Sequence, residues 1–194
     1  MLMNRIVGAL TFKRQVYADV EKDTSFNATA WAIVAGLALI TQFGTYWFAA
    51  EDTTSAIVAG AVGTIVTVVG FAVGAWVIAW MGKAMFKADV SFDEMVRTLG
   101  LAYIWNFFGA LAALGNVIPL LGCLTAPGAC IGWILGLVSY FIATQEALDL
   151  DTGQTVITVI AGWVVTFLII ASATFVIGLL GVSVGATGGM FNFQ

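Results

Sequence analysis

The residue types that could do chemistry are few in this sequence, and they exclude most enzymatic sites. The 194 residues include no histidine, and the aspartates and glutamates all lie outside the long apolar runs. Without histidine, the usual nucleophile-base pairs and the common metal and haem ligand sets cannot be built. A glycine-rich phosphate loop followed by lysine is also missing from the sequence. The sequence therefore predicts a non-enzymatic protein with no cofactor and no metal.

Three amides in the predicted apolar spans are the conspicuous polar groups expected at membrane depth. They are Gln42, Asn106 and Asn116. An amide in this setting either hydrogen-bonds a neighbouring helix or lines a polar path. Both interpretations remain open at this stage.

Two cysteines, Cys123 and Cys130, lie seven residues apart near a predicted turn. In an oxidising compartment this pair could form a disulfide that closes a small loop. Two free cysteines that pack as small apolar side chains are the alternative.

Residues 81–100 form the internal segment where charges of both signs gather. Its basic residues, Lys83, Lys87 and Arg97, are expected to contact lipid headgroups, and a dedicated ligand site is the alternative. Ser91 with Glu94 three residues later is the pattern of a capping box, which predicts that a helix begins there.

The composition indicates an integral membrane protein. Hydrophobic residues make up 61% of the chain and charged residues only 9%. The charge-free runs 24–50, 53–82, 98–145 and 152–194 each exceed the roughly 20 residues that a helix needs to cross a bilayer. The run 98–145 is long enough for two crossings, with a turn at the prolines and glycines of residues 119–128.

The predicted fold is therefore an all-α integral membrane protein with five transmembrane helices and an N-terminal interfacial amphipathic segment. Residues 1–26 carry apolar side chains among charges at loosely helical spacing, which predicts a segment in the membrane interface. Residues 27–194 form the membrane domain, and its spans are expected at about 27–50, 55–81, 98–118, 128–148 and 155–180.

The basic residues predict the orientation of these spans. All seven fall on the N-terminal segment or on the connection between the second and third spans. Because basic residues concentrate on the cytoplasmic side, the N-terminus is expected in the cytoplasm and the C-terminus outside.

Glycines at helical spacing are expected to form helix-packing faces, which favours contact between membrane helices. The sequence predicts an accessory subunit or scaffold that packs against other integral membrane proteins or against itself, surrounded by membrane lipids. The alternative is a small-solute transporter or channel, and no nucleic acid partner is expected. The candidate interface residues are Gly70, Gly74, Gly128, Gly132, Gly136, Gly181 and Gly185.

Several stretches resemble the Ypt-interacting protein family, the Yip domain, in its short prokaryotic branch. They are SFDEMVRTLGLAY from residue 91, IPLLG from residue 118, IGWILGL from residue 131 and TQEALDLDTGQTVITVIAGW from residue 144. The resemblance implies five spans, a cytoplasmic N-terminus and a place in the plasma (inner) membrane of a prokaryote.

The sequence also departs from the eukaryotic members of that family. Those members have a long hydrophilic N-terminal domain and an aspartate-leucine-tyrosine-glycine-proline motif, and neither occurs in this sequence. A small GTPase is therefore not expected as a partner.

Overall fold

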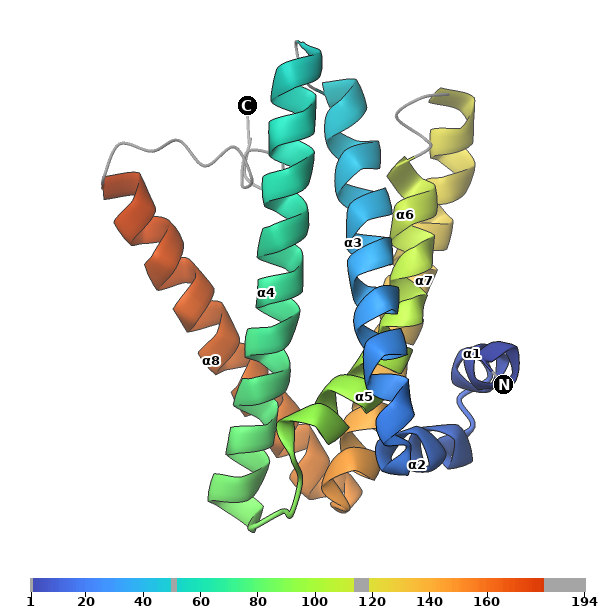
Figure 1. The fold of residues 1–194 in the computed structure, drawn as a ribbon, viewed down its shortest axis with the longest axis vertical. Helices are drawn as coiled ribbons and strands as arrows, with labels where there is room; N and C mark the ends of the chain where they lie inside the picture. Colours follow the sequence, from blue (N-terminus) through green and yellow to red (C-terminus); the bar gives the residue numbers. More distant parts are fainter. Residues whose placement is uncertain (1, 50–51, 114–118, 180–194) are drawn as a thin grey trace.

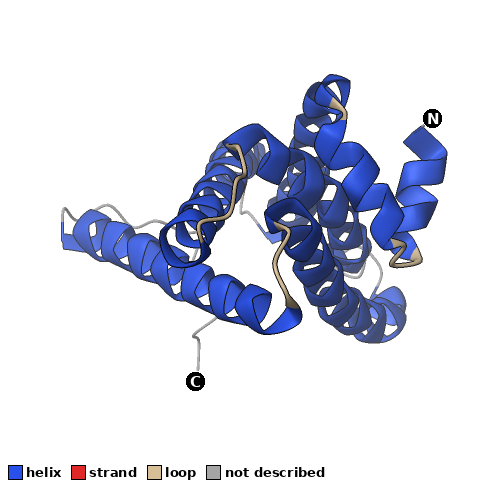
Figure 2. Cartoon of the chain, turned by 90° about the horizontal axis from the view of Figure 1, so that it is seen from below, coloured by secondary structure: helices blue, strands red, loops and turns tan. Residues whose placement is uncertain are grey.

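The computed structural model of the chain describes residues 2–49, 52–113 and 119–179, and these residues contain helices and no strand. The elements are α1 (Leu2–Leu10), α2 (Arg14–Lys22), η1 (Thr24–Phe26), α3 (Asn27–Ala49), α4 (Thr53–Phe86), α5 (Phe92–Ala102), η2 (Tyr103–Asn106), α6 (Phe107–Ala113), α7 (Pro119–Leu148) and α8 (Thr152–Leu179). In Figure 1, α3, α4, α6 and α7 stand upright, α8 leans away from α4 toward the upper left, and α5 and α2 lie across the lower end of the bundle. Seen from that end in Figure 2, short loops join several of the helices.

Three helical stretches within the described residues are long and apolar enough to cross a membrane. They are Thr24–Trp47, Thr53–Phe86 and Pro127–Leu148, and Thr152–Val165 forms a shorter apolar helix. Large apolar side chains on these helices are exposed, for example Ile65 on α4 and Ile134 on α7. The chain is therefore an all-helical membrane protein whose outer helix faces suit lipid.

The second predicted span, 55–81, is part of a longer helix. α4 runs for 34 residues, or about 50 Å, from an N-cap at Asp52 to a C-cap at Lys87. Asp52 accepts a hydrogen bond from the Ser55 amide, and Lys87 adopts a left-handed conformation with a φ of 58°. This left-handed residue ends the helix, and the amide of Ala88 donates to the carbonyl of Gly82.

The third predicted span, 98–118, is divided in the structure. α5 begins at the predicted capping box, where Ser91 accepts from the Glu94 amide and Glu94 accepts from the Ser91 amide. α5 then lies across the lower end of the bundle, and the 3-10 segment η2 separates it from the upright α6 (Figure 1). Almost all of α5 from Met95 onward is buried, so this helix belongs to the core and not to a lipid-facing span.

The turn predicted across residues 119–128 is wrong. α7 begins at Pro119 and passes through Pro127, so the fourth helix starts nine residues before the predicted position 128. Proline suits the first position of a helix because the missing amide has no helical partner there, and Pro127 is tolerated inside an apolar helix.

The early start of α7 bears on the two cysteines. Two residues seven apart on one helix are separated by about 10 Å along the axis, beyond the roughly 7 Å that a disulfide spans between Cα atoms. Cys130 is exposed and free, and the side chain of Cys123 lies outside the described residues. This geometry favours the alternative of two separate cysteines.

Glycines mark the closest approaches between helices in the core. A Cβ atom added to Gly100 would lie 2.8 Å from the Cβ of Ala30, which joins α5 to α3. A Cβ on Gly162 would lie 2.6 Å from Ile78, which joins α8 to α4. These approaches leave no room for a larger residue.

We predict that Gly132→Ala destabilises the protein, whereas Gly128→Ala on the same helix does not. A Cβ at Gly132 would lie 2.3 Å from the Cβ of Phe108, and a Cβ at Gly128 would meet nothing within 4 Å. α6 and α7 must move apart to relieve the first contact. Thermal unfolding in detergent measures the difference, and equal melting temperatures for the two variants would contradict this packing.

Candidate functional site

A groove opens between the helices in the described part of the chain. Its volume is about 490 Å³, and α4, α7, α8 and the α5–η2–α6 segment contribute to its walls. The groove is open to the surroundings, since Trp133 on its wall is 65% exposed. Its aromatic side chains are Phe71, Tyr103, Trp105, Trp133, Tyr140 and Trp163.

Four of the predicted interface glycines line this groove, but they do so in two different ways. Gly132 and Gly136 on α7 are packed by the chain itself, because Phe108 and Trp105 lie against them. Gly70 on α4 has no described atom within 4 Å of a Cβ built there, and Gly74 has only the Tyr140 hydroxyl at 3.9 Å. The α4 wall of the groove therefore presents open backbone at Gly70 and Gly74, next to the side chain of Phe71.

The other three predicted interface residues are not among the described residues that line the groove. Gly128 lies on α7 but does not line the hollow, and Gly181 and Gly185 lie outside the described residues. Glycines outside the predicted set, such as Gly82 against Leu148, also pack tightly. Glycine spacing alone could not reveal them because it does not identify the facing helix.

The amides within the apolar runs occupy different positions. Asn106 is exposed and lines the groove, and its amide nitrogen donates to the carbonyl of Tyr103 at 3.2 Å. Gln42 donates to the Thr67 hydroxyl at 3.0 Å and so joins α3 to α4. Asn116 lies outside the described residues.

The three basic residues between positions 81 and 100 differ in their exposure to the surroundings. Lys83 and Lys87 are exposed at the lower end of α4, where contact with lipid headgroups stays a prediction. Arg97 is only 4% exposed, so the headgroup role predicted for it is wrong.

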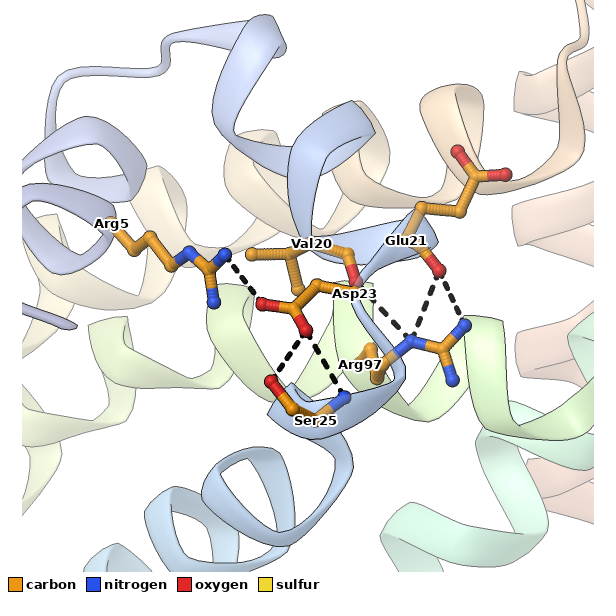
Figure 3. Close-up of polar contacts among 6 residues, drawn as sticks. All are labelled: Arg5, Val20, Glu21, Asp23, Ser25 and Arg97. Carbon is orange, nitrogen blue, oxygen red and sulfur yellow. Dashed lines mark hydrogen bonds and ion pairs between the residues drawn. The ribbon is translucent and has the colours of Figure 1, made fainter. Parts of the chain in front are cut away.

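Arg97 instead binds the end of α2 (Figure 3). Its Nε donates to the carbonyls of Val20 at 3.2 Å and Glu21 at 3.0 Å, and a terminal nitrogen also donates to the Glu21 carbonyl. The last carbonyls of a helix have no partner within that helix, and a cation is favourable near them. The guanidinium therefore caps the C-terminal end of α2. Sequence reasoning missed this contact because Arg97 and Glu21 are 76 residues apart.

Residues 2–22 form two consecutive helices, here called the α1–α2 hairpin. Two further contacts hold this hairpin against the bundle. The Tyr17 hydroxyl and the Ser139 hydroxyl on α7 are hydrogen-bonded at 2.6 Å, and both residues are buried. Arg14 lies 3.5 Å from the Glu146 carboxylate. The hairpin is thus docked on α5 and α7 by contacts spread over its second helix.

Glu21 lies in an acidic environment beside this dock. Burial raises the pKa of its carboxyl, and the negative charges of Asp149 and Glu94 raise it further. The three residues come from α2, the turn after α7 and the start of α5. Within residues 2–49, 52–113 and 119–179, no group of three or more acidic or cysteine side chains is arranged to hold a metal ion.

The comparison with known families fits this arrangement. A family model for the Yip1 domain matches residues 7–186, which is nearly the whole chain. The chain belongs to the Yip1 domain family. Comparisons with curated proteins and with solved structures found no match.

Two of the stretches that carry the resemblance to the Yip family lie at the lower end of this Yip1 domain. One begins at Ser91 and forms α5, and the other contains the turn between α7 and α8 (Figure 1). The Gln145 side chain closes that turn by donating to the Leu150 carbonyl and to the Thr152 hydroxyl, both at 3.3 Å. Both stretches thus build the platform on which α2 docks.

We predict that Arg97→Lys and Arg97→Met both destabilise the Yip1 domain by about 2–3 kcal/mol. A hydrogen bond from a charged donor typically contributes about 1.5–3 kcal/mol, and lysine lacks the planar fork that reaches two carbonyls. Lys87→Met, at an exposed position, is the matched control and should unfold like the unmodified protein. Wild-type stability of Arg97→Lys, measured by thermal or denaturant unfolding, would refute the capping role.

We predict that Glu21→Gln raises the unfolding temperature at pH 7. Because the folded-state pKa of Glu21 is raised, ionisation of this carboxyl is less favourable in the folded state, and stability falls as the pH rises through its pKa. The advantage of Glu21→Gln should therefore shrink as the pH falls through and below the ordinary glutamate pKa of about 4.3. Asp19→Asn, at an exposed position on α2, is the control. If the difference in unfolding temperature between Glu21→Gln and the unmodified protein stayed constant across this pH range, the carboxyl charge would not be its cause.

Proposed function

We propose that this Yip1 domain is a non-enzymatic accessory subunit or scaffold that packs against a helix of another membrane protein. The open backbone at Gly70 and Gly74 on the α4 wall of the groove supports this proposal. Gly70 and Gly74 have the spacing that lets another helix approach the backbone closely, and the described chain does not fill that space.

The contrast with the other glycines strengthens the proposal. Where this protein needs a close approach for its own fold, a neighbouring atom lies within 3 Å of the position that a Cβ would occupy, as at Gly100, Gly132 and Gly162. Gly70 and Gly74 carry the same cost in helix stability without that internal contact. A partner helix in the groove accounts for glycine at these positions.

Asn106 supplies a polar contact suited to such a partner. Its nitrogen makes one bond to its own segment, and a side-chain amide has a second N–H and a carbonyl oxygen. Amides of this kind hydrogen-bond across membrane helices. Solute transport would need polar groups along a continuous path, whereas the groove is lined chiefly by aromatic residues and glycines.

We further propose that the chain crosses the inner membrane of a prokaryotic cell five times, with its N-terminus in the cytoplasm. All seven basic residues lie on the α1–α2 hairpin, on α5, or at the C-terminal end of α4 and the loop that follows it. α2, α5 and that end of α4 are at the lower end of the bundle in Figure 1. That end is expected to face the cytoplasm. On this layout α3, α4, α7 and α8 cross the membrane, and the segment that contains α6 makes the remaining crossing.

We predict that Gly70→Leu and Gly74→Leu release a membrane-protein partner without unfolding this chain. The Cβ atom at either position has open space beside it, and the rest of the leucine extends into the groove, so binding should weaken by tenfold or more, which is about 1.4 kcal/mol. Gly36→Leu on α3 is the matched control, because it also meets nothing within 4 Å but does not line the groove.

The measurement is quantitative co-purification in mild detergent, followed by crosslinking from a photoreactive residue at Phe71 in the groove. The same crosslinker at Ile65, which is exposed on α4 but does not line the groove, is its control. Partners retained equally by Gly70→Leu, Gly74→Leu and Gly36→Leu would refute the groove as the binding site.

A further inference from the structure

We infer that the α1–α2 hairpin regulates the groove through a stack of three aromatic rings. This inference rests on the proposed function, because the groove that it controls is the proposed partner site. The three rings belong to Phe12 in the hairpin, Trp105 in η2 and Phe108 in α6.

The stack is continuous from the hairpin to the groove. The rings of Phe12 and Trp105 have centroids 5.3 Å apart and an interplanar angle of 7°. The rings of Trp105 and Phe108 follow at 5.5 Å and 21°. Offset stacking of this kind is more favourable than simple burial of the same rings. Each ring therefore restrains the next.

The middle ring of the stack forms part of one wall of the groove, and the last ring packs directly behind that wall. Trp105 itself lines the groove and is only 6% exposed, and its Cβ lies 3.3 Å from the position of a Cβ on Gly136. Phe108 lies against Gly132, so closely that glycine is needed there. A shift of either ring changes the space between α6 and α7 on the groove side.

The segment that carries Trp105 is placed to act as a hinge. η2 is a 3-10 turn between α5 and α6, and a 3-10 stretch within a helix often marks a hinge. α5 on one side is held by its capping box and by the bond from Arg97 to α2. Movement at η2 is therefore expected to displace α6 and the aromatic wall rather than α5.

Phe12 joins this hinge to a strained connection in the hairpin. It stands between α1 and α2 with a φ of 56°, a left-handed conformation that is unfavourable for a bulky residue. Such strain persists when surrounding contacts hold it, and here the contact is the Trp105 ring. Undocking the hairpin removes that ring from Trp105 and frees the groove wall to move.

The experiment measures the width of the groove in the isolated full-length chain in lipid nanodiscs, with no partner present. Spin labels are attached at Gly70→Cys and Gly109→Cys, which line the groove on α4 and α6 and have open space beside them, after Cys123 and Cys130 are changed to alanine. A second label pair at Gly36→Cys and Gly70→Cys reports the packing of α3 on α4. Electron paramagnetic resonance gives both distance distributions.

Phe12→Ala should shift or broaden the Gly70–Gly109 distribution by about 2 Å, the scale of helix shifts at interfaces, and leave the Gly36–Gly70 distribution unchanged. Phe12→Trp, which keeps a ring on Trp105, should restore the original distribution. If Phe12→Ala fails to fold, Phe12→Leu removes the ring more mildly and should give the same shift.

An unchanged Gly70–Gly109 distribution would overturn the inference, and so would equal changes in both label pairs. These measurements do not depend on a partner. Failure of the proposed function would appear only in the co-purification and crosslinking experiment.

Discussion

The buried guanidinium of Arg97 is the constraint on which much of this structure depends. A charged group away from water is costly unless hydrogen bonds replace its hydration. In this fold the replacement comes from the carbonyls of Val20 and Glu21 at the end of α2. These hydrogen bonds place a helix from the beginning of the chain against a helix from its middle.

This pairing explains why the third expected span is not one straight helix. α5 lies across the lower end of the bundle, where Arg97 reaches α2, so the chain has to turn before α6 (Figure 1). η2 provides that turn and α6 continues upward. The same turn brings Trp105 next to Phe12 and places Tyr103 and Asn106 in the groove. The position of the hairpin and the shape of the groove thus share one cause.

The parts of the fold that could be predicted from the sequence are those decided by neighbouring residues. The capping box at Ser91 and Glu94 needs only a spacing of three residues, and it is confirmed. The predicted start of α7 is wrong because Pro127, which would break many helices, is tolerated within an apolar one. The burial of Arg97 could not be predicted, since it depends on α2, whose carbonyls are distant in the sequence.

The glycines of the groove are a second case in which the sequence could not predict a contact between distant residues, and this contact bears on function. Spacing placed Gly70, Gly74, Gly132 and Gly136 on helix-packing faces, and all four line one groove, but spacing gives no information about the neighbour that each glycine meets. The two on α7 are used by Phe108 and Trp105, so a larger residue there would disturb folding and any partner contact together. The two on α4 meet almost nothing in the described chain, so a larger residue there acts on the groove without first disrupting the core. Substitutions at Gly70 and Gly74 can therefore test partner binding without changing the stability of the fold, whereas substitutions at Gly132 and Gly136 cannot. The reason is that the aromatic stack packs against the α7 side of the groove and not against the α4 side.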